Sequence, residues 1–202
     1  MIQTMELSVG TLIILSVVVV SVLAFSNRAL MDRLILVPHR VARGREYYRL
    51  LTAGWVHGDT AHLLFNMLSL YFFAGSVERS LGTPQFLLLY LSAVVVGFVP
   101  TALRHRGSSN YRSLGASGAV SAVIFSAIVI NPELRMYLMF VPIPVPGWLF
   151  ALAYLAYSAY SSRRGGDNIN HDAHFTGALY GVALTVALAP DLAERGLRAL
   201  LG

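Results

Sequence analysis

Long runs of apolar residues, almost free of charge, alternate with short polar segments along this chain. Of its 202 residues, 56% are hydrophobic and only 12% are charged, whereas a soluble domain carries about a quarter charged residues. Backbone polar groups in lipid must be satisfied within the chain, so helices are the default way to cross a bilayer. The pattern therefore predicts an all-α, polytopic membrane protein, with no room for a large soluble domain as well.

Six apolar segments approach the roughly 20 residues that a helix needs to cross a bilayer. The expected spans are 7–25, 61–77, 84–103, 116–130, 147–161 and 173–189. The last three are short, which suits helices buried among others. The first has no basic segment before it and no clear cleavage site after it, so we expect a retained helix rather than a signal peptide. Because no internal repeat is present, we expect residues 1–202 to form a single membrane domain.

Charge and cysteine usage exclude several classes of function. The net charge is +5, and all fifteen basic residues are arginines that lie mainly between the apolar runs. A basic chain can bind nucleic acid, but membrane topology and lipid headgroups explain these arginines more simply. We therefore expect membrane lipids and no nucleic acid as partners. The chain has no cysteine, which excludes disulfides, thiolate metal sites and cysteine nucleophiles.

Four polar residues stand at the beginnings of alternate spans. His62 and Asn66 lie in the first turns of the second span, Ser117 opens the fourth, and His174 opens the sixth. In an up-and-down bundle these three helices all begin at the same membrane face, so the four residues share a similar depth. Polar groups are costly in lipid, and their coincidence indicates a functional site.

These residue types suit nucleophilic catalysis. A serine hydroxyl such as that of Ser117 needs a base to take its proton, and an imidazole such as that of His174 titrates near neutral pH. The attack creates an oxyanion, which needs donors already in place. His62 and Asn66 are four residues apart, on one helix face, and could supply two of them. The N–H of Ser117, at a helix N-terminus, could supply another.

Small residues on the sixth span favour a close helix contact. Gly177 and Gly181 are spaced four residues apart, and Gly118 and Ala122 offer a matching small face on the fourth span. Close approach of these two helices would bring His174 within hydrogen-bond reach of Ser117.

Several motifs together resemble the rhomboid family of intramembrane serine proteases. They occur in the family's order over about residues 45–185, and each alone would be weak. They are Tyr48-Arg49, His57 with His62-Leu63-Leu64-Phe65-Asn66, Val77-Glu78-Arg79-Ser80-Leu81-Gly82, Gly115-Ala116-Ser117-Gly118, and Ala173-His174-Phe175-Thr176-Gly177 with Gly181.

The resemblance implies a compact, bacterial-type bundle of six membrane helices that cleaves transmembrane segments of other proteins. It makes Ser117 the nucleophile and His174 the general base, with His62 and Asn66 lining the oxyanion hole. It implies no cofactor and no metal, transmembrane proteins as substrates, and a multi-pass location in a bacterial inner membrane. The chain departs from the family at Ser121, where many members carry an aromatic residue against the catalytic histidine. Another group must then orient His174.

Two other functions remain open from the sequence. The first is a rhomboid-like protein that binds membrane clients without cutting them, although the intact Ser117–His174 pair argues against it. The second is a metal or haem protein using His57, His62, His171 and His174. The chain has no HExxH or HxxxH pair, so we expect His171 to be a loop residue and His57 to anchor a loop.

Two arguments predict opposite orientations of the chain in the membrane. The first, third and fifth connections hold eleven of the fifteen arginines, so the positive-inside rule would place them in the cytoplasm. The resemblance implies the reverse, with the N-terminus inside and the site opening outward. The first connection is partly embedded in the membrane in the family, which weakens its arginines as a topology signal. We adopt the orientation that the resemblance implies.

Overall fold

Every predicted span is a helix in the computed structural model, which describes residues 8–137, 143–164 and 169–201. Leu7, the first residue of the first predicted span, lies outside the described residues. The six helices are α1 (Val9–Ser26), α5 (Thr60–Leu81), α6 (Thr83–Arg104), α7 (Ser117–Ile130), α8 (Gly147–Arg164) and α9 (His171–Leu188). The helical fold class is therefore confirmed.

The helices differ in how well they suit a bilayer. Among the described residues, α1, α5 and α6 are each long and apolar enough to cross a membrane. Helix α9 and the following α10 (Pro190–Leu201) qualify together, with a bend of 113° between them. Helix α7 is apolar but has only 14 residues. The part of the chain that the structure describes thus holds three to four candidate spans, and the count of six stays a prediction.

Polar caps set the first residues of α5 and α9, two of the helices that carry the site. Asp59 accepts a hydrogen bond from the His62 N–H at the start of α5. Asn170 accepts one from the Ala173 N–H at the start of α9. Each cap satisfies a backbone donor that has no partner inside its helix. These caps fix where α5 and α9 begin, close to His62 and His174.

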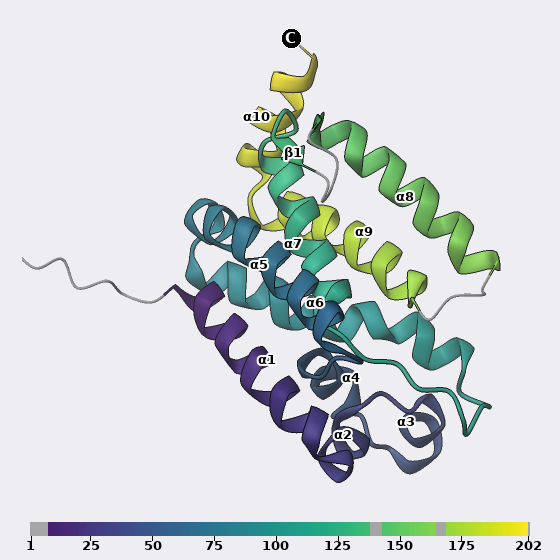
Figure 1. Cartoon of the computed structure of the whole chain (residues 1–202). Helices are drawn as coiled ribbons and strands as arrows, with labels where there is room; N and C mark the ends of the chain where they lie inside the picture. The colour runs from purple at the N-terminus through teal and green to yellow at the C-terminus, as the bar shows by residue number, and fades with distance from the viewer. Residues whose placement is uncertain (1–7, 138–142, 165–168, 202) are drawn as a thin grey trace, which may run out of the picture.

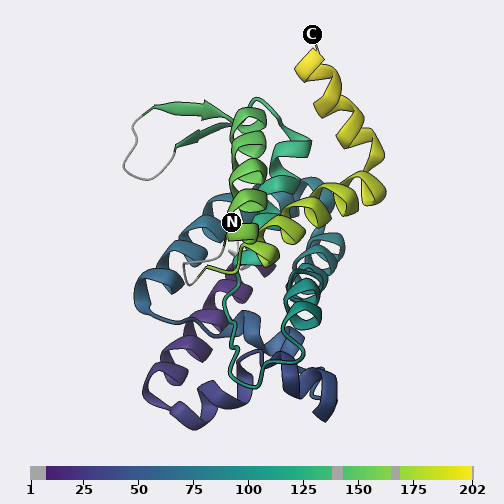
Figure 2. The same ribbon diagram turned by 90° about the vertical axis from the view of Figure 1, so that its right-hand side faces the viewer.

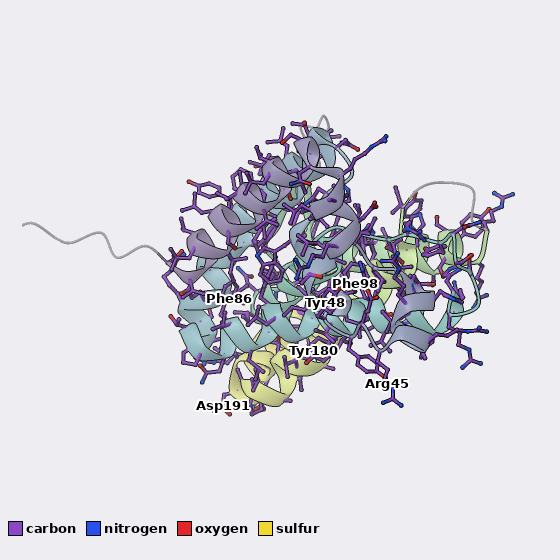
Figure 3. All side chains as sticks on the ribbon, turned by 90° about the horizontal axis from the view of Figure 1, so that it is seen from below. Arg45, Tyr48, Phe86, Phe98, Tyr180 and Asp191 are labelled. Carbon is purple, nitrogen blue, oxygen red and sulfur yellow. The ribbon has the colours of Figure 1, made fainter. Side chains whose placement is uncertain are left out.

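The long first connection folds into four short helices below the bundle (Figure 1). They are α2 (Arg28–Leu34), α3 (Pro38–Gly44), α4 (Arg49–Thr52) and the 3₁₀ helix η1 (Ala53–Trp55). Buried Arg49 donates to the carbonyls of Asp32 and Ile35 and pairs with Glu46. Figure 3 shows the neighbouring Arg45 pointing away from the molecule instead. Arg49 therefore fixes this connection.

Glu78 fastens the first helix to the second long one. Its carboxylate accepts from the N–H groups of Val9 and Gly10, at the N-terminus of α1, and from the Thr83 hydroxyl. A carboxylate at a helix N-terminus also gains from the positive end of the helix dipole. Glu78 therefore fixes helix ends, as Arg49 fixes the first connection.

Helix α7 occupies the centre of the bundle. Ten of its 14 residues are buried, and it packs against α5, α6 and α9. Helix α8 lies at the edge, along α9, where it is seen clearly in Figure 1. Helix α7 is too short for a full span, and the helices packed around it cover most of its surface.

Beyond the six predicted spans and the short helices of the first connection, the described residues form two further features that were not predicted. A hairpin of β1 (Arg135–Tyr137) and β2 (Pro144–Pro146) follows α7 and projects sideways from the bundle (Figure 2). Helix α10 follows α9 after the sharp bend. Both follow the C-terminal ends of α7 and α9, so they lie at the end opposite Ser117 and His174. The all-α prediction therefore needs one small antiparallel hairpin added to it.

Candidate active site

Ser117 and His174 share a hydrogen bond. Ser117 is the first residue of α7, and His174 lies one turn into α9. The Ser117 Oγ and His174 Nε2 atoms are 2.7 Å apart, and both side chains are half-buried. A hydroxyl that donates to an imidazole nitrogen is the geometry in which the nitrogen can take its proton.

The approach of α7 and α9 depends on glycines that leave no room for a side chain. A Cβ placed on Gly177 would lie 2.1 Å from the Gly118 carbonyl oxygen. One placed on Gly181 would lie 2.3 Å from the Ala122 carbonyl oxygen. These distances confirm the predicted small-residue contact between the two helices. They also explain why residues 57 positions apart in the chain meet at one hydrogen bond.

A cavity of about 960 Å³ opens beside this pair. Its lining includes Ser117 and His174, together with His62 and Asn66 of α5 and Tyr154 of α8. The structure therefore brings all four predicted site residues to the wall of one cavity.

His62 lies against a glycine that the backbone also requires. Gly115 has φ +108°, a conformation that other residues rarely adopt, and an added Cβ would lie 2.6 Å from the His62 ring. The side-chain nitrogen of Asn66, one turn later, donates to the His62 carbonyl at 2.9 Å. Gly115 thus lets the imidazole of His62 lie against the backbone just before the Ser117 helix.

His57 anchors the turn that precedes Ser117. The Ala116 N–H donates to His57 Nε2 at 3.3 Å, so this nitrogen must carry no proton. His57 Nδ1 then donates to the Ser21 hydroxyl at 3.0 Å, and Ser21 donates to the Trp55 carbonyl at 2.9 Å. The predicted loop-anchoring role of His57 is confirmed by these bonds.

Burial keeps His57 neutral. Its side chain is fully buried, and this burial, aided by the neighbouring His62, lowers its pKa to about 3. The aromatic rings of His57 and His62 meet edge to face, with centroids 4.9 Å apart. A neutral imidazole is the form that the Ala116 N–H requires.

The segment before Ser117 is also fastened by residues that sequence reasoning missed. Leu36 and Ser113 exchange backbone hydrogen bonds of 2.9 and 3.1 Å, and the Gly115 N–H donates to the Ala53 carbonyl at 2.9 Å. The side chain of Asn170 donates to the Ser113 hydroxyl at 2.9 Å. Asn170 therefore joins the start of α9 to the turn before α7, a role that no local sequence signal marks.

His171 and Asp172 lie close to His174 in the sequence but have other roles in the structure. His171 is the buried first residue of α9 and not a loop histidine, because the helix starts earlier than predicted. Asp172 pairs with Arg104 at 2.6 Å and accepts from Ser162, so it serves the ends of α6 and α8. Among the described residues, no three His, Asp or Glu side chains converge in an arrangement that could hold a metal ion.

Comparison with known proteins identifies a family that matches most of this chain. The rhomboid domain model matches residues 44–191. The chain is 33% identical to "RHOMBOID-like protein 12, mitochondrial" of Arabidopsis thaliana over 170 residues, which are 76% of this chain and 50% of that protein. It is 40% identical to "Putative rhomboid protease YdcA" of Bacillus subtilis (strain 168) over 80 residues, 40% of this chain and 39% of that protein.

A human protein is similar as well. "Presenilin-associated rhomboid-like protein, mitochondrial" of Homo sapiens is 32% identical over 135 residues, 66% of this chain and 36% of that protein. The chain spans half or less of the length of each of these three relatives. Their names include two mitochondrial proteins and a bacterial one, so the expected bacterial inner membrane does not follow from them.

Proposed function

Because the chain belongs to the rhomboid family, we propose that it is an intramembrane serine endopeptidase. Ser117 acts as the nucleophile and His174 as the general base. The observation that carries the proposal is the 2.7 Å contact between Ser117 Oγ and His174 Nε2 at the wall of a cavity. A client-binding protein that does not cut has no need of that bond.

The first half of the reaction forms an acyl-enzyme. His174 Nε2 takes the Ser117 proton while Oγ attacks the carbonyl carbon of the scissile peptide. The carbonyl oxygen becomes an oxyanion, held by the Ser117 N–H, which as the first residue of α7 has no partner within the helix. Side-chain donors of His62 and Asn66 assist it, and losing one such donor typically costs about 2.7–4 kcal/mol of barrier.

Collapse of this tetrahedral intermediate completes the acyl-enzyme, and hydrolysis then releases the acyl group. The protonated His174 gives its proton to the leaving amine as the peptide C–N bond breaks. A water molecule then loses a proton to His174 Nε2 and attacks the ester carbon. The Ser117 oxygen recovers the proton as it leaves, and the products are one free amine and one free carboxylic acid.

The setting of the site supports transmembrane segments as substrates. The cavity lies between α5 and α8, and its lining combines the polar site residues with Phe65 and Phe150. Such a wall suits an apolar peptide that is cut at one polar point. We further propose that the six predicted helices all span the membrane and that the protein resides in a bacterial inner membrane.

Labelling with a fluorophosphonate probe tests this function, because the probe reacts only with an activated serine. Wild-type protein in detergent is expected to be labelled and to cleave a single-span test substrate. Ser117→Ala and His174→Ala are each expected to lower both activities by at least about 10³-fold. Ser126→Ala is the matched control. Ser126 lies deeper on α7, accepts a hydrogen bond from the Thr185 hydroxyl and does not line the cavity.

Folded wild-type protein without labelling and without cleavage would instead support the client-binding alternative. Cleavage retained in Ser117→Ala would show that another residue attacks. Thermal unfolding of each variant separates loss of chemistry from loss of the fold.

A further inference from the structure

The position one turn after the nucleophile holds a buried serine. Ser121 follows Ser117 on α7 and is only 4% exposed. Its Oγ lies 2.7 Å from the Oη of Tyr154, a residue of α8. A small polar side chain on α7 therefore holds the end of a large aromatic side chain from a neighbouring helix.

The ring of Tyr154 reaches the imidazole of His174. The two rings are 20° from parallel, and their centroids lie 6.2 Å apart, within the range of offset stacking. Phe125 and Phe150 flank Tyr154, with centroids 5.6 and 5.5 Å from its ring. Tyr154 is thus fixed at its hydroxyl by Ser121 and along its ring by two phenylalanines.

We propose that Tyr154 is a positioning residue for His174, acting from α8. The inference rests on the proposed function, in which Nε2 of His174 must face Ser117 Oγ. An imidazole can turn about its Cβ–Cγ bond, and an aromatic ring against one face restricts that rotation. Ser121 leaves room for the Tyr154 ring and supplies a hydrogen-bond partner for the hydroxyl of this half-buried tyrosine.

This arrangement makes α8 part of the reaction geometry. Ser117 and His174 come from α7 and α9, whereas the ring against His174 comes from a helix at the edge of the bundle. The far end of α8 is tied to α9, where Ser162 donates to Asp172. The orientation of His174 is therefore set only while α8 lies against α7 and α9.

Two substitutions at Tyr154 separate the contribution of its ring from the contribution of its hydroxyl. Tyr154→Leu removes the stacked ring, and the rate of Ser117 labelling and kcat are expected to fall about 10- to 100-fold, because a small misplacement of a catalytic group costs that much. Tyr154→Phe keeps the ring and loses one hydrogen bond, so a loss of about two- to ten-fold is expected. KM for the test substrate is expected to change little in Tyr154→Phe.

A second-site rescue distinguishes positioning from general packing. The double variant Ser121→Phe with Tyr154→Leu returns a ring to the same space from α7. Its labelling rate is expected to exceed that of Tyr154→Leu alone by about ten-fold. This gain would restore most of the rate that is lost when His174 is misplaced. A purely structural role for Tyr154 predicts no recovery of rate, because the double variant carries a second core substitution.

Tyr160→Leu is the matched control, because Tyr160 is an exposed tyrosine on the same helix. It is expected to label at the wild-type rate. If Tyr154→Leu also labels at that rate, the inference is wrong although the protease assignment stands, since wild-type protein is labelled and Ser117→Ala is not. If wild-type protein is not labelled, the proposed function fails, and this inference fails with it.

Discussion

At the scale of the residue, the clearest physical constraint falls on His57. Its two ring nitrogens have fixed and opposite roles, as acceptor from Ala116 and donor to Ser21. A second proton on Nε2 would face the Ala116 N–H and remove the anchor next to Ser117. The same burial that shields this bond lowers the pKa of His57 to about 3.

This pKa predicts a loss of stability in acid. Between pH 3 and the ordinary histidine value of about 6.5, the unfolded chain binds a proton at His57 that the folded chain does not. The free energy of unfolding therefore falls as pH drops below about 6.5, by about 1.4 kcal/mol per pH unit from this group. Above that pH its contribution is constant.

The comparison that isolates His57 is with His57→Gln, which cannot titrate. Thermal unfolding in detergent at pH 7.5, 6.0 and 5.0 is expected to show a smaller drop in the midpoint for the variant than for wild-type protein. The variant is expected to be less stable at pH 7.5, since it loses part of the anchor. Equal drops in the two proteins would contradict the assigned neutral state.

At the scale of the element, the contact of α7 with α9 decides whether a site exists. The Gly118 carbonyl occupies the space that a Gly177 side chain would need. Even one methyl group must therefore push the helices apart, and overpacking of this kind costs about 1–3 kcal/mol. Because His174 and Ser117 sit at the start of this contact, a separation of the helices also breaks their hydrogen bond.

Gly177→Ala is therefore expected to lose both stability and activity. We expect a lower unfolding midpoint and a fall of about 10²-fold in fluorophosphonate labelling, since a 1 Å misplacement can cost that much. The matched control is Gly75→Ala on α5, where a new Cβ meets only the flexible end of Arg79 at 3.2 Å. That variant is expected to be neutral or slightly more stable, because alanine favours helix over glycine. Full activity in Gly177→Ala would rule out the close contact.

At the scale of the whole molecule, two of the arginines in the topology count also serve the fold. Of the eleven in the odd connections, Arg49 is buried and donates to backbone carbonyls, and Arg104 is paired with Asp172. The positions of these two residues are explained by the fold, but the other nine still outnumber the four arginines on the opposite side. The orientation that the family resemblance implies, with the site facing the compartment opposite the N-terminus, stays a prediction.

Single cysteines can test this orientation, because the chain has none of its own. Arg43→Cys lies in the exposed part of the first connection, on the site side, and Arg195→Cys lies on α10 at the other end. In intact bacteria, a membrane-impermeant maleimide is expected to label Arg43→Cys directly and Arg195→Cys only after permeabilisation. The reverse result would favour the arginine count.

Sequence patterns were sufficient for features that depend on neighbours along the chain. Apolar runs determined six helices, and spacing placed His62, Asn66, Ser117 and His174 at one end of alternate helices. The paired small residues of α7 and α9 predicted their close contact. Helix α10, the β1–β2 hairpin and the short helices of the first connection were missed, because all of them lie outside the apolar runs.

The tertiary structure alone decided what depends on residues distant in the chain. It joined Asn170 to Ser113, gave His57 its partners from Ser21 and Ala116, and moved His171 from a loop into a buried helix start. It also brought Tyr154 against His174. The sequence could determine which helices form and which of their ends carry polar groups, since both follow from local periodicity. Which side chain fills the space beside His174 depends on how three helices pack, and no local pattern contains that information.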